Sequence, residues 1–108
     1  MTRDASMSPK VRRALDEMWP GVHEAARAHL SYIDAFLAAG DACSTAQRVA
    51  ARSAAHRLSG SLGMFGRREA SSVAASIEEL LTVDFTTTPP ELRTLVARLD
   101  SLLGLAAH

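Results

Sequence analysis

The chain has 108 residues, of which 47% are hydrophobic and 22% charged, the composition of one ordinary globular domain. Its 12 basic and 12 acidic residues balance, so no overall positive field attracts nucleic acid. The single cysteine, Cys43, excludes an internal disulfide and a cysteine-based metal site, and no run reaches the roughly 18 apolar residues of a membrane span. These features predict one cytoplasmic domain over residues 1–108, with an ordered core over about 8–105 and neither nucleic acid nor a membrane as partner.

The first half of the chain has the apolar spacing of helices, and no segment alternates with the period of a strand. The Ser8-Pro9 pair predicts the start of a short helix, and the Pro20-Gly21 pair predicts its end. A second helix is then predicted up to Gly40, a residue type favoured just past a helix end. Its inner face consists of Val22, Ala26, Leu30, Ile33 and Leu37.

The third predicted helix, over about residues 44–65, carries a histidine on the side away from its apolar residues. At about 100° per residue, Leu58 lies close to Ala54 in the apolar stripe, whereas His56 lies about 200° round and faces outward. Gly60 shares the side of His56, although a glycine costs a helix up to about 1 kcal/mol relative to alanine. An exposed imidazole beside a residue without a side chain indicates chemistry carried out with a large partner.

Two further helices are predicted after Gly66, which turns the chain. The first has an apolar face formed by Ala70, Val73, Ala74, Ile77, Leu80 and Leu81. Thr88 and Glu91 predict a capping box at the start of the last helix, which is rich in leucine. Short connections make consecutive helices antiparallel neighbours. The predicted fold is therefore all-α, an antiparallel up-down four-helix bundle with a short extra N-terminal helix.

The segment Ala55-His56-Arg57-Leu58-Ser59-Gly60-Ser61 carries a resemblance to a known family, together with Phe65-Gly66 and, one helix later, Ile77-Glu78. It resembles the motif of the histidine phosphotransfer (HPt) domain family, roughly Ala-His-x-Leu-Lys-Gly-Ser, then an apolar-Gly pair and an apolar-Glu pair. The resemblance extends over about residues 22–103. It implies a four-helix bundle whose exposed histidine carries a phosphoryl group in two-component relays.

The resemblance implies that His56 is the phosphoacceptor, with a neutral ring nitrogen that attacks a phosphoaspartate. Gly60, one turn later, leaves space for the phosphoryl group and the partner, and Gly63 either does the same or lets another helix approach. Glu78 matches the family glutamate and is interpreted as a structural tie to the turn near Gly66. The phosphate surroundings are predicted at Ser59, Gly60, Arg52 and Arg57, and the partner-docking residues at Val49, Gly63, Met64 and Arg67.

Ser59 departs from the family motif, which usually has a lysine at this position. A cation near the phosphoryl group would stabilise its charge, and a serine offers only a neutral hydrogen bond. Arg52, Arg57 or Arg67 is expected to supply the missing positive charge.

The resulting prediction is a phosphorelay intermediate that accepts a phosphoryl group on His56 from one receiver domain and passes it to another. It is a phosphocarrier and no enzyme, since no ATP-binding or kinase domain is predicted. It needs no cofactor of its own, because the receiver would supply Mg²⁺. Two alternatives stay open: a non-phosphorylated interaction module, such as a receiver-binding inhibitor or scaffold, and a dimeric structural bundle suggested by the leucine-rich last helix.

Overall fold

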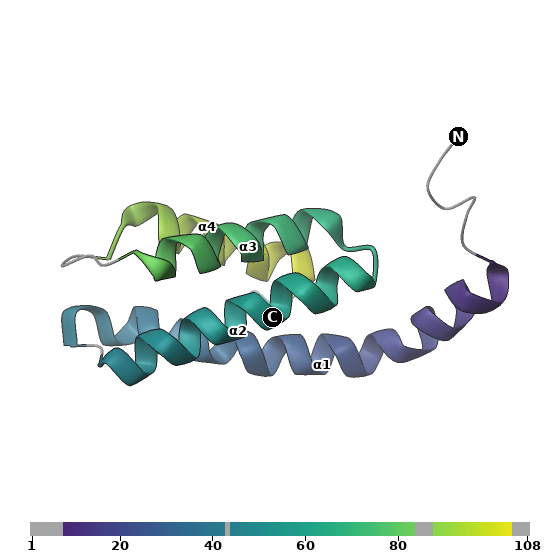
Figure 1. The fold of residues 1–108 in the computed structure, drawn as a ribbon, viewed down its shortest axis with the longest axis horizontal. Helices are drawn as coiled ribbons and strands as arrows, with labels where there is room; N and C mark the ends of the chain where they lie inside the picture. Colours follow the sequence, from purple (N-terminus) through teal and green to yellow (C-terminus); the bar gives the residue numbers. More distant parts are fainter. Residues whose placement is uncertain (1–7, 43, 84–87, 105–108) are drawn as a thin grey trace.

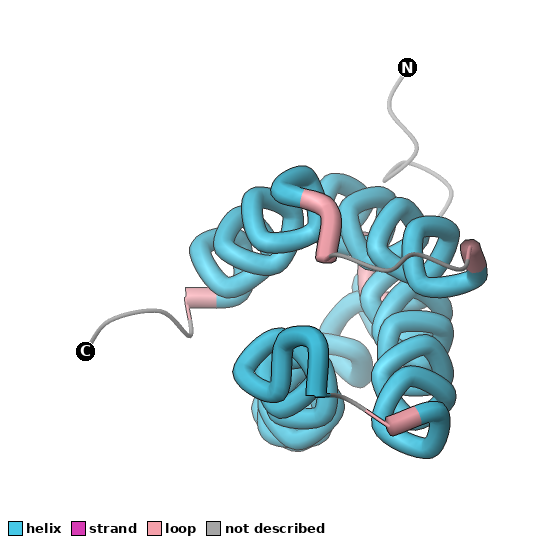
Figure 2. Tube along the Cα trace, turned by 90° about the vertical axis from the view of Figure 1, so that its left-hand side faces the viewer, coloured by secondary structure: helices cyan, strands magenta, loops and turns pink. Residues whose placement is uncertain are grey.

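The protein is described by a computed structural model over residues 8–42, 44–83 and 88–104. It consists of α1 (Pro9–Ala39), the 3-10 turn η2 (Gly40–Ala42), α2 (Thr45–Met64), α3 (Arg68–Thr82) and α4 (Pro90–Leu103). Figure 1 shows the chain reversing direction between consecutive helices, and the end view in Figure 2 shows the helices around a common centre. These ranges contain no strand, which confirms the all-α class and the four-helix bundle. The predicted start of the ordered core, residue 8, is the first described residue, and its predicted end, residue 105, lies outside the described ranges.

The core is built from the apolar faces of all four helices, as the helical spacing predicts. Its largest side chains with almost no exposed surface are Phe36, Ile33, Leu58, Leu62, Ile77, Leu81, Leu92 and Leu99. No buried polar or charged side chain occurs within the described part of the chain. The bundle therefore depends on apolar burial, worth roughly 1.5–3 kcal/mol for each large side chain, and its polar residues remain available at the surface.

The predicted separate N-terminal helix is wrong, because α1 is continuous through Pro20. A proline inside a helix lacks the N–H that would bond to the carbonyl of Asp16, and it bends a helix without always ending it. In Figure 1 the N-terminal part of α1 curves away from the axis of the rest and extends past the end of the bundle. The first buried residue of α1 is Ala26, well after this proline.

Two helix ends follow their local glycine signals, whereas the predicted start of the last helix does not. Gly40 and Gly66 have φ of 57° and 77°, which L-residues with side chains rarely adopt, and they turn the chain after α1 and α2. The capping box predicted around Thr88 and Glu91 is not formed, because α4 begins one residue later, with Pro89 as its N-cap and no side-chain cap bond. Pro89 has no N–H to donate to a glutamate side chain, so the reciprocal bond of a capping box is impossible there.

Aromatic side chains lie both at the centre of the core and at one end of the bundle. Phe36 is fully buried. Trp19 and Phe65 are half-buried, with ring centroids 6.2 Å apart, where α1 passes the turn after α2. At the same end His23 Nε2 lies 2.7 Å from the carbonyl oxygen of Leu103, which ties the C-terminus of α4 to α1. The leucines of α4 mostly face the core of this bundle: Leu92, Leu99 and Leu103 are buried and Leu95 is half-buried.

Two carboxyl groups, those of Asp34 on α1 and Asp100 on α4, have raised pKa values. Desolvation raises the pKa of Asp34 above its usual 3.8. Desolvation, and then the charge of Asp34, raise the pKa of Asp100 above the same value. A raised pKa in the folded state means that folding takes up protons, so this pair opposes folding at neutral pH. This unfavourable contribution to folding stability becomes smaller as the pH falls through the pKa values of the folded state towards 3.8, because the carboxyl groups become protonated.

We therefore expect Asp100→Asn to stabilise the protein at pH 7 and to flatten the dependence of stability on pH. The gain should not exceed about 0.5 kcal/mol, because both groups remain largely solvated. The measurement is the free energy of unfolding of both proteins between pH 4 and pH 7, with Glu79→Gln, an exposed change on α3, as control. A gain that persists unchanged at the lowest pH would contradict the electrostatic cause.

Candidate functional site

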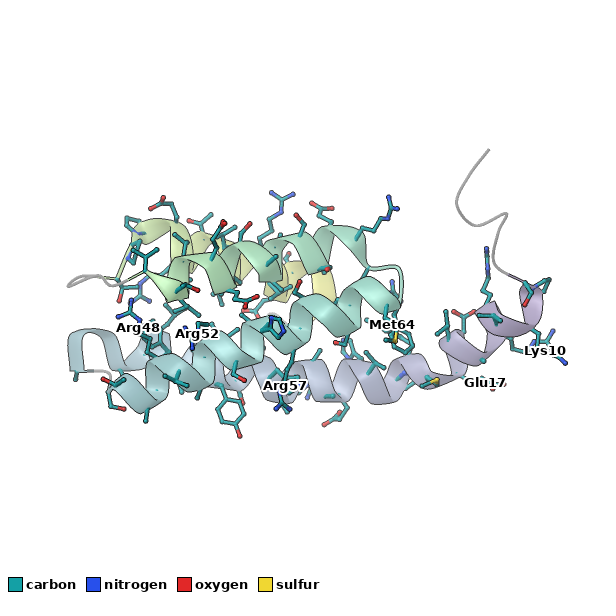
Figure 3. All side chains as sticks on the ribbon, viewed as in Figure 1. Lys10, Glu17, Arg48, Arg52, Arg57 and Met64 are labelled. Carbon is teal, nitrogen blue, oxygen red and sulfur yellow. The ribbon has the colours of Figure 1, made fainter. Side chains whose placement is uncertain are left out.

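The N-terminal half of α2 is fixed at its start and against the end of α3. Ser44 caps the helix: its hydroxyl accepts from the backbone N–H of Gln47 at 3.1 Å, and the Gln47 side chain accepts from the Ser44 N–H at 2.8 Å. One turn later, the Arg48 guanidinium donates to the carbonyl of Leu81 at 3.2 Å and to that of Val83. Figure 3 shows Arg48 projecting from α2 towards this end of α3.

The C-terminal half of α2 approaches α3 closely at a pair of small residues. A Cβ atom added at Gly63 would lie 3.1 Å from the Ser71 hydroxyl oxygen, which is tighter than an ordinary contact. That hydroxyl donates to the carbonyl of Ser59 at 2.7 Å. Of the two interpretations of Gly63, close helix packing is therefore supported by a direct contact.

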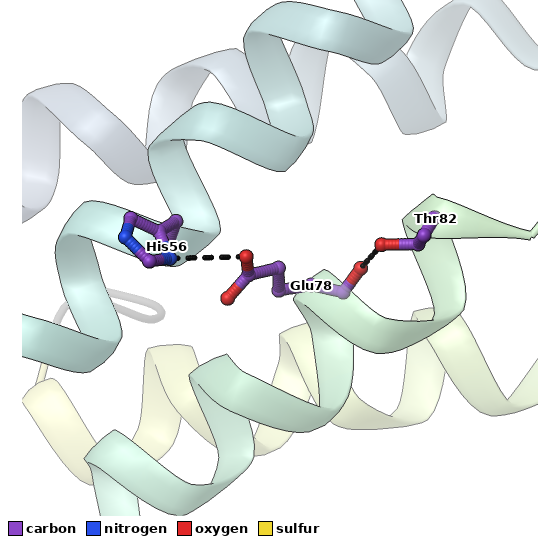
Figure 4. Close-up of polar contacts among 3 residues, drawn as sticks. All are labelled: His56, Glu78 and Thr82. Atoms are coloured by element: carbon purple, nitrogen blue, oxygen red, sulfur yellow. Dashed lines mark hydrogen bonds and ion pairs between the residues drawn. The ribbon is translucent and has the colours of Figure 1, made fainter.

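His56 lies on the outer side of α2, opposite Glu78 of α3 (Figure 4). Its side chain is 75% exposed, and its Nδ1 atom is 3.0 Å from Oε2 of Glu78, whose side chain is 32% exposed. The backbone carbonyl of Glu78 accepts from the Thr82 hydroxyl at 2.9 Å. The imidazole therefore faces outward as predicted, and the Glu78 carboxylate contacts one of its two nitrogens.

This geometry decides which ring nitrogen is available for reaction. A carboxylate accepts a hydrogen bond and does not donate one, so in the neutral imidazole the proton belongs on Nδ1. Nε2 then carries the lone pair and lies on the far side of the ring from Glu78 (Figure 4). The carboxylate also stabilises the positive charge that develops on the ring when Nε2 attacks an electrophile. The pair thus holds an exposed nitrogen nucleophile in one orientation.

A shallow surface depression of about 420 Å³ surrounds this pair. It lies between α2 and α3 and is lined by Val49, Arg52, Ser53, His56, Glu78 and Thr82. Arg52, one turn before His56, brings a permanent positive charge to the depression (Figure 3). An open depression of this kind suits a phosphoryl group presented by another protein better than a free metabolite, which typically needs an enclosing pocket.

The other two arginines considered as phosphate neighbours have different surroundings. Arg57 lines a separate depression of about 360 Å³ with His29 and Tyr32 of α1, and Figure 3 shows it directed towards α1. The guanidinium carbon of Arg67 lies 4.0 Å from the centre of the Trp19 ring, a cation–π contact at the end of the bundle. Of the three arginines, Arg52 lines the depression around His56, and Arg57 and Arg67 are not among the residues that line it.

The predicted docking residues fall into two groups. Val49 and Gly63 are exposed and recur at helical spacing with Arg52, His56 and Gly60 of the predicted phosphate surroundings, so these residues form one outward row along α2. A Cβ at Gly60 would meet nothing within 4 Å, so this position is open above the helix. Met64, 70% exposed, ends α2 about 12 Å from His56 along the axis. Arg67 lies beyond the helix, so Met64 and Arg67 belong to the end of the bundle.

Glu78 is the site residue that sequence reasoning placed wrongly. It does not tie α3 to the turn near Gly66, because its carboxylate contacts His56 on the neighbouring helix. The sequence contains Ile77-Glu78 as part of the motif, but its pairing with His56 depends on the register between α2 and α3. In this register Gly63 lies against Ser71 and Arg48 donates to the carbonyl of Leu81, contacts between residues far apart in the sequence that no local pattern predicts.

The described ranges contain no group of three or more His, Cys, Asp or Glu residues able to hold a metal ion. None of the helices in these ranges is both long and apolar enough to cross a membrane.

A comparison with known families supports what this geometry indicates. The family model described as the Hpt domain matches residues 12–106, which is most of the chain. Searches of curated proteins and of solved structures gave no match. A four-helix bundle with an exposed histidine on its second helix defines a phosphocarrier module, and the chain belongs to the histidine phosphotransfer (HPt) domain family. Membership implies histidine phosphotransfer in two-component phosphorelay signalling and interaction with receiver domains.

Proposed function

We propose that this protein is a phosphorelay intermediate in which Nε2 of His56 carries the phosphoryl group between two receiver domains. The observation that carries the proposal is the exposed imidazole held at Nδ1 by Glu78, with the second nitrogen free to react. The proposal includes the antiparallel up-down order of the helices, supported by the chain reversals in Figure 1. It also includes a cytoplasmic location.

The transfer step involves one bond formed and one broken. The lone pair of His56 Nε2 attacks the phosphorus of a receiver phosphoaspartate in line, and the P–O bond to the aspartate breaks, returning the carboxylate. The Nδ1 proton stays hydrogen-bonded to Glu78 throughout. In the second step, the aspartate of another receiver attacks the phosphorus and the N–P bond breaks. Mg²⁺ would be held by the receiver and would neutralise the phosphoryl oxygens.

The docking surface in this proposal is the outward row of α2 from Val49 to Gly63, with Arg52 beside the phosphoryl group. Gly60 lets the receiver come within bonding distance of Nε2, since nothing projects above the helix there. Ser59, on the same side of α2, is half-buried, and its carbonyl is engaged by Ser71. Arg52 therefore takes the electrostatic role that a lysine at position 59 has in the family motif.

The decisive experiment incubates the purified chain with a panel of receiver domains phosphorylated on aspartate. We expect the chain to acquire phosphate that is labile in acid and stable in base, the behaviour of phosphohistidine. Loss of phosphate from one receiver and its appearance on a second would then establish the carrier role. Binding to receivers without any uptake of phosphate would instead support the alternative of a non-phosphorylated interaction module.

A change at Glu78 tests whether it positions His56. We expect Glu78→Gln to slow phosphoryl uptake by roughly two- to fivefold, because a partly exposed pair is worth about 0.2–1 kcal/mol. The specific readout is ¹⁵N NMR of the His56 ring, where loss of the carboxylate should reduce the fraction of the tautomer protonated on Nδ1. The control is Glu79→Gln on the same helix, an exposed neighbour that does not contact His56. An unchanged tautomer in Glu78→Gln would refute the positioning role.

The arginines allow a matched pair of variants. Arg52→Ala should slow uptake or shorten the phosphohistidine lifetime by roughly two- to fivefold at low salt, whereas Arg57→Ala should change neither. The effect of Arg52→Ala should shrink at 1 M salt, where the screening length falls to about 3 Å. Adding Ser59→Lys to the Arg52→Ala variant should recover the lost uptake rate or phosphohistidine lifetime. Equal effects of the two arginines would exclude a local role for Arg52.

A further inference from the structure

Two exposed valines from different helices lie at the same edge of the His56 depression. Val49 of α2 is 49% exposed and lines the depression. Val83, the C-cap of α3, is 60% exposed and directly follows Thr82, which also lines the depression. The two valines are far apart in the sequence, so the packing of α2 against α3 is what brings them to one place.

Arg48 holds this edge together. Its guanidinium donates to the carbonyl of Leu81 at 3.2 Å and to the carbonyl of Val83. Both carbonyls are at the C-terminal end of α3, where a helix has no N–H groups of its own to bond them. Figure 3 shows Arg48 reaching from α2 to this end of α3. The residue next to Val49 is therefore bonded to the backbone of Val83, which fixes Val83 at the start of α2.

The valines give a polar depression one apolar edge. Apart from Val49, the residues that line the depression are polar or charged: Arg52, Ser53, His56, Glu78 and Thr82. Single exposed apolar side chains are ordinary on a protein surface, but here two of them meet beside a reactive nitrogen. Within the described ranges, no exposed large hydrophobic residue besides Val49 lines this depression, and Val83 adjoins it.

A receiver domain that brings its aspartate to His56 also covers this edge. Val49 lies seven residues before His56, about 10 Å along the helix axis. A specific interface of ordinary size covers about 800 Å² on each partner, which is a patch about 16 Å in radius. A patch of that size centred on His56 includes Val49 and extends towards the end of α3.

From this continuity we propose that Val49 and Val83 form an apolar contact for the receiver domain, which presents an apolar side chain to them while its phosphoaspartate faces His56. The inference rests on the proposed function, because the occupant is the same receiver. The interface then has two parts of different chemistry. Salt weakens the attraction of Arg52 for the phosphoryl group, whereas it does not screen apolar burial at the valines. The apolar contact fixes the orientation of the receiver and selects receivers that have an apolar residue in the matching place.

The test measures the dissociation constant of the chain and a receiver domain by isothermal titration calorimetry. The receiver is one from the phosphotransfer panel that binds the chain, whether or not it donates phosphate. Val83→Ser should raise the dissociation constant roughly three- to tenfold, because the apolar contact is lost. Val83→Ile keeps an apolar side chain and should change it less than about twofold. Leu102→Ser, the same kind of loss at a 40% exposed position on α4, which does not contact α2, should leave it unchanged.

The salt dependence of binding separates the two parts of the interface. Arg52→Ala should reduce the weakening of binding by salt, whereas Val83→Ser should weaken binding by the same factor at low and at high salt. Val49→Ser and Val83→Ser should together cost less than the product of their separate effects, since both valines contact the same receiver side chain. Circular dichroism checks that each variant folds.

An unchanged dissociation constant in folded Val83→Ser would overturn the proposal, and so would an equal effect of Leu102→Ser. A receiver that transfers phosphate but whose affinity does not depend on Val83 would remove the apolar contact and leave the phosphocarrier function standing. Binding that depends on Val83 without any uptake of phosphate would do the reverse. A chain that binds no receiver of the panel would overturn both.

Discussion

Replacing the imidazole of His56 should abolish phosphoryl uptake while the bundle stays folded. In His56→Gln no ring nitrogen remains to attack the phosphoaspartate, so acid-labile phosphate should fall to background. The free energy of unfolding should change by less than about 0.5 kcal/mol, because the side chain is 75% exposed and its one bond is to a partly exposed carboxylate. The measurement combines phosphate transfer from a phosphorylated receiver with urea denaturation.

The matched control for this variant is His29→Gln, which removes a half-buried histidine of α1 that lines the other depression. It should keep full uptake, so the pair separates a specific acceptor from a general loss of imidazole. If a well-folded His56→Gln protein still gained acid-labile phosphate, the acceptor would be one of the other histidines.

The helices were largely predictable because their signals are local. Apolar residues at helical spacing identify the inner faces of α2, α3 and α4, and the glycines at positions 40 and 66 mark turns because of their positive φ. The start of α2 near Ser44 also has a local cause, its capping box with Gln47. In each case a few neighbouring residues carry the whole signal.

The two errors in the fold both involve prolines. Pro20 was expected to end a helix, but the apolar face of α1 continues beyond it, and tertiary packing from Ala26 onward holds the helix together. The Thr88–Glu91 capping box failed because Pro89 took the N-cap position. Proline limits the backbone at its own position, and the surrounding packing decides whether a helix bends there or ends.

Only the part of the candidate site that lies within α2 could be predicted from the sequence. The outward placement of His56 follows from the angular spacing within α2, and the family motif supports it. Its partner Glu78 comes from another helix, and whether the two meet depends on the register of α3 against α2. The same limit applies to the arginines, because only the assembled bundle directs Arg57 towards α1 and Arg52 into the His56 depression.

A substitution at Gly60, in the outward row of α2, should have a second large effect on phosphoryl transfer. Gly60→Leu should stabilise the bundle by up to about 1 kcal/mol, because leucine is the better helix former and a Cβ there meets nothing within 4 Å. The same variant should slow phosphoryl transfer by about 100-fold, since its side chain stands one turn from His56, where the receiver must bring its aspartate to within bonding distance.

Gly60→Ala separates these two effects, because it gains similar helix stability with a side chain of one methyl group. We expect Gly60→Ala to retain most of the transfer rate, so that loss of transfer follows the size of the side chain and does not follow stability. The measurement is the transfer rate from a phosphorylated receiver for both variants, with thermal unfolding run in parallel. Equal transfer in the wild type and a folded Gly60→Leu protein would show that the receiver docks on a surface other than the outward row of α2.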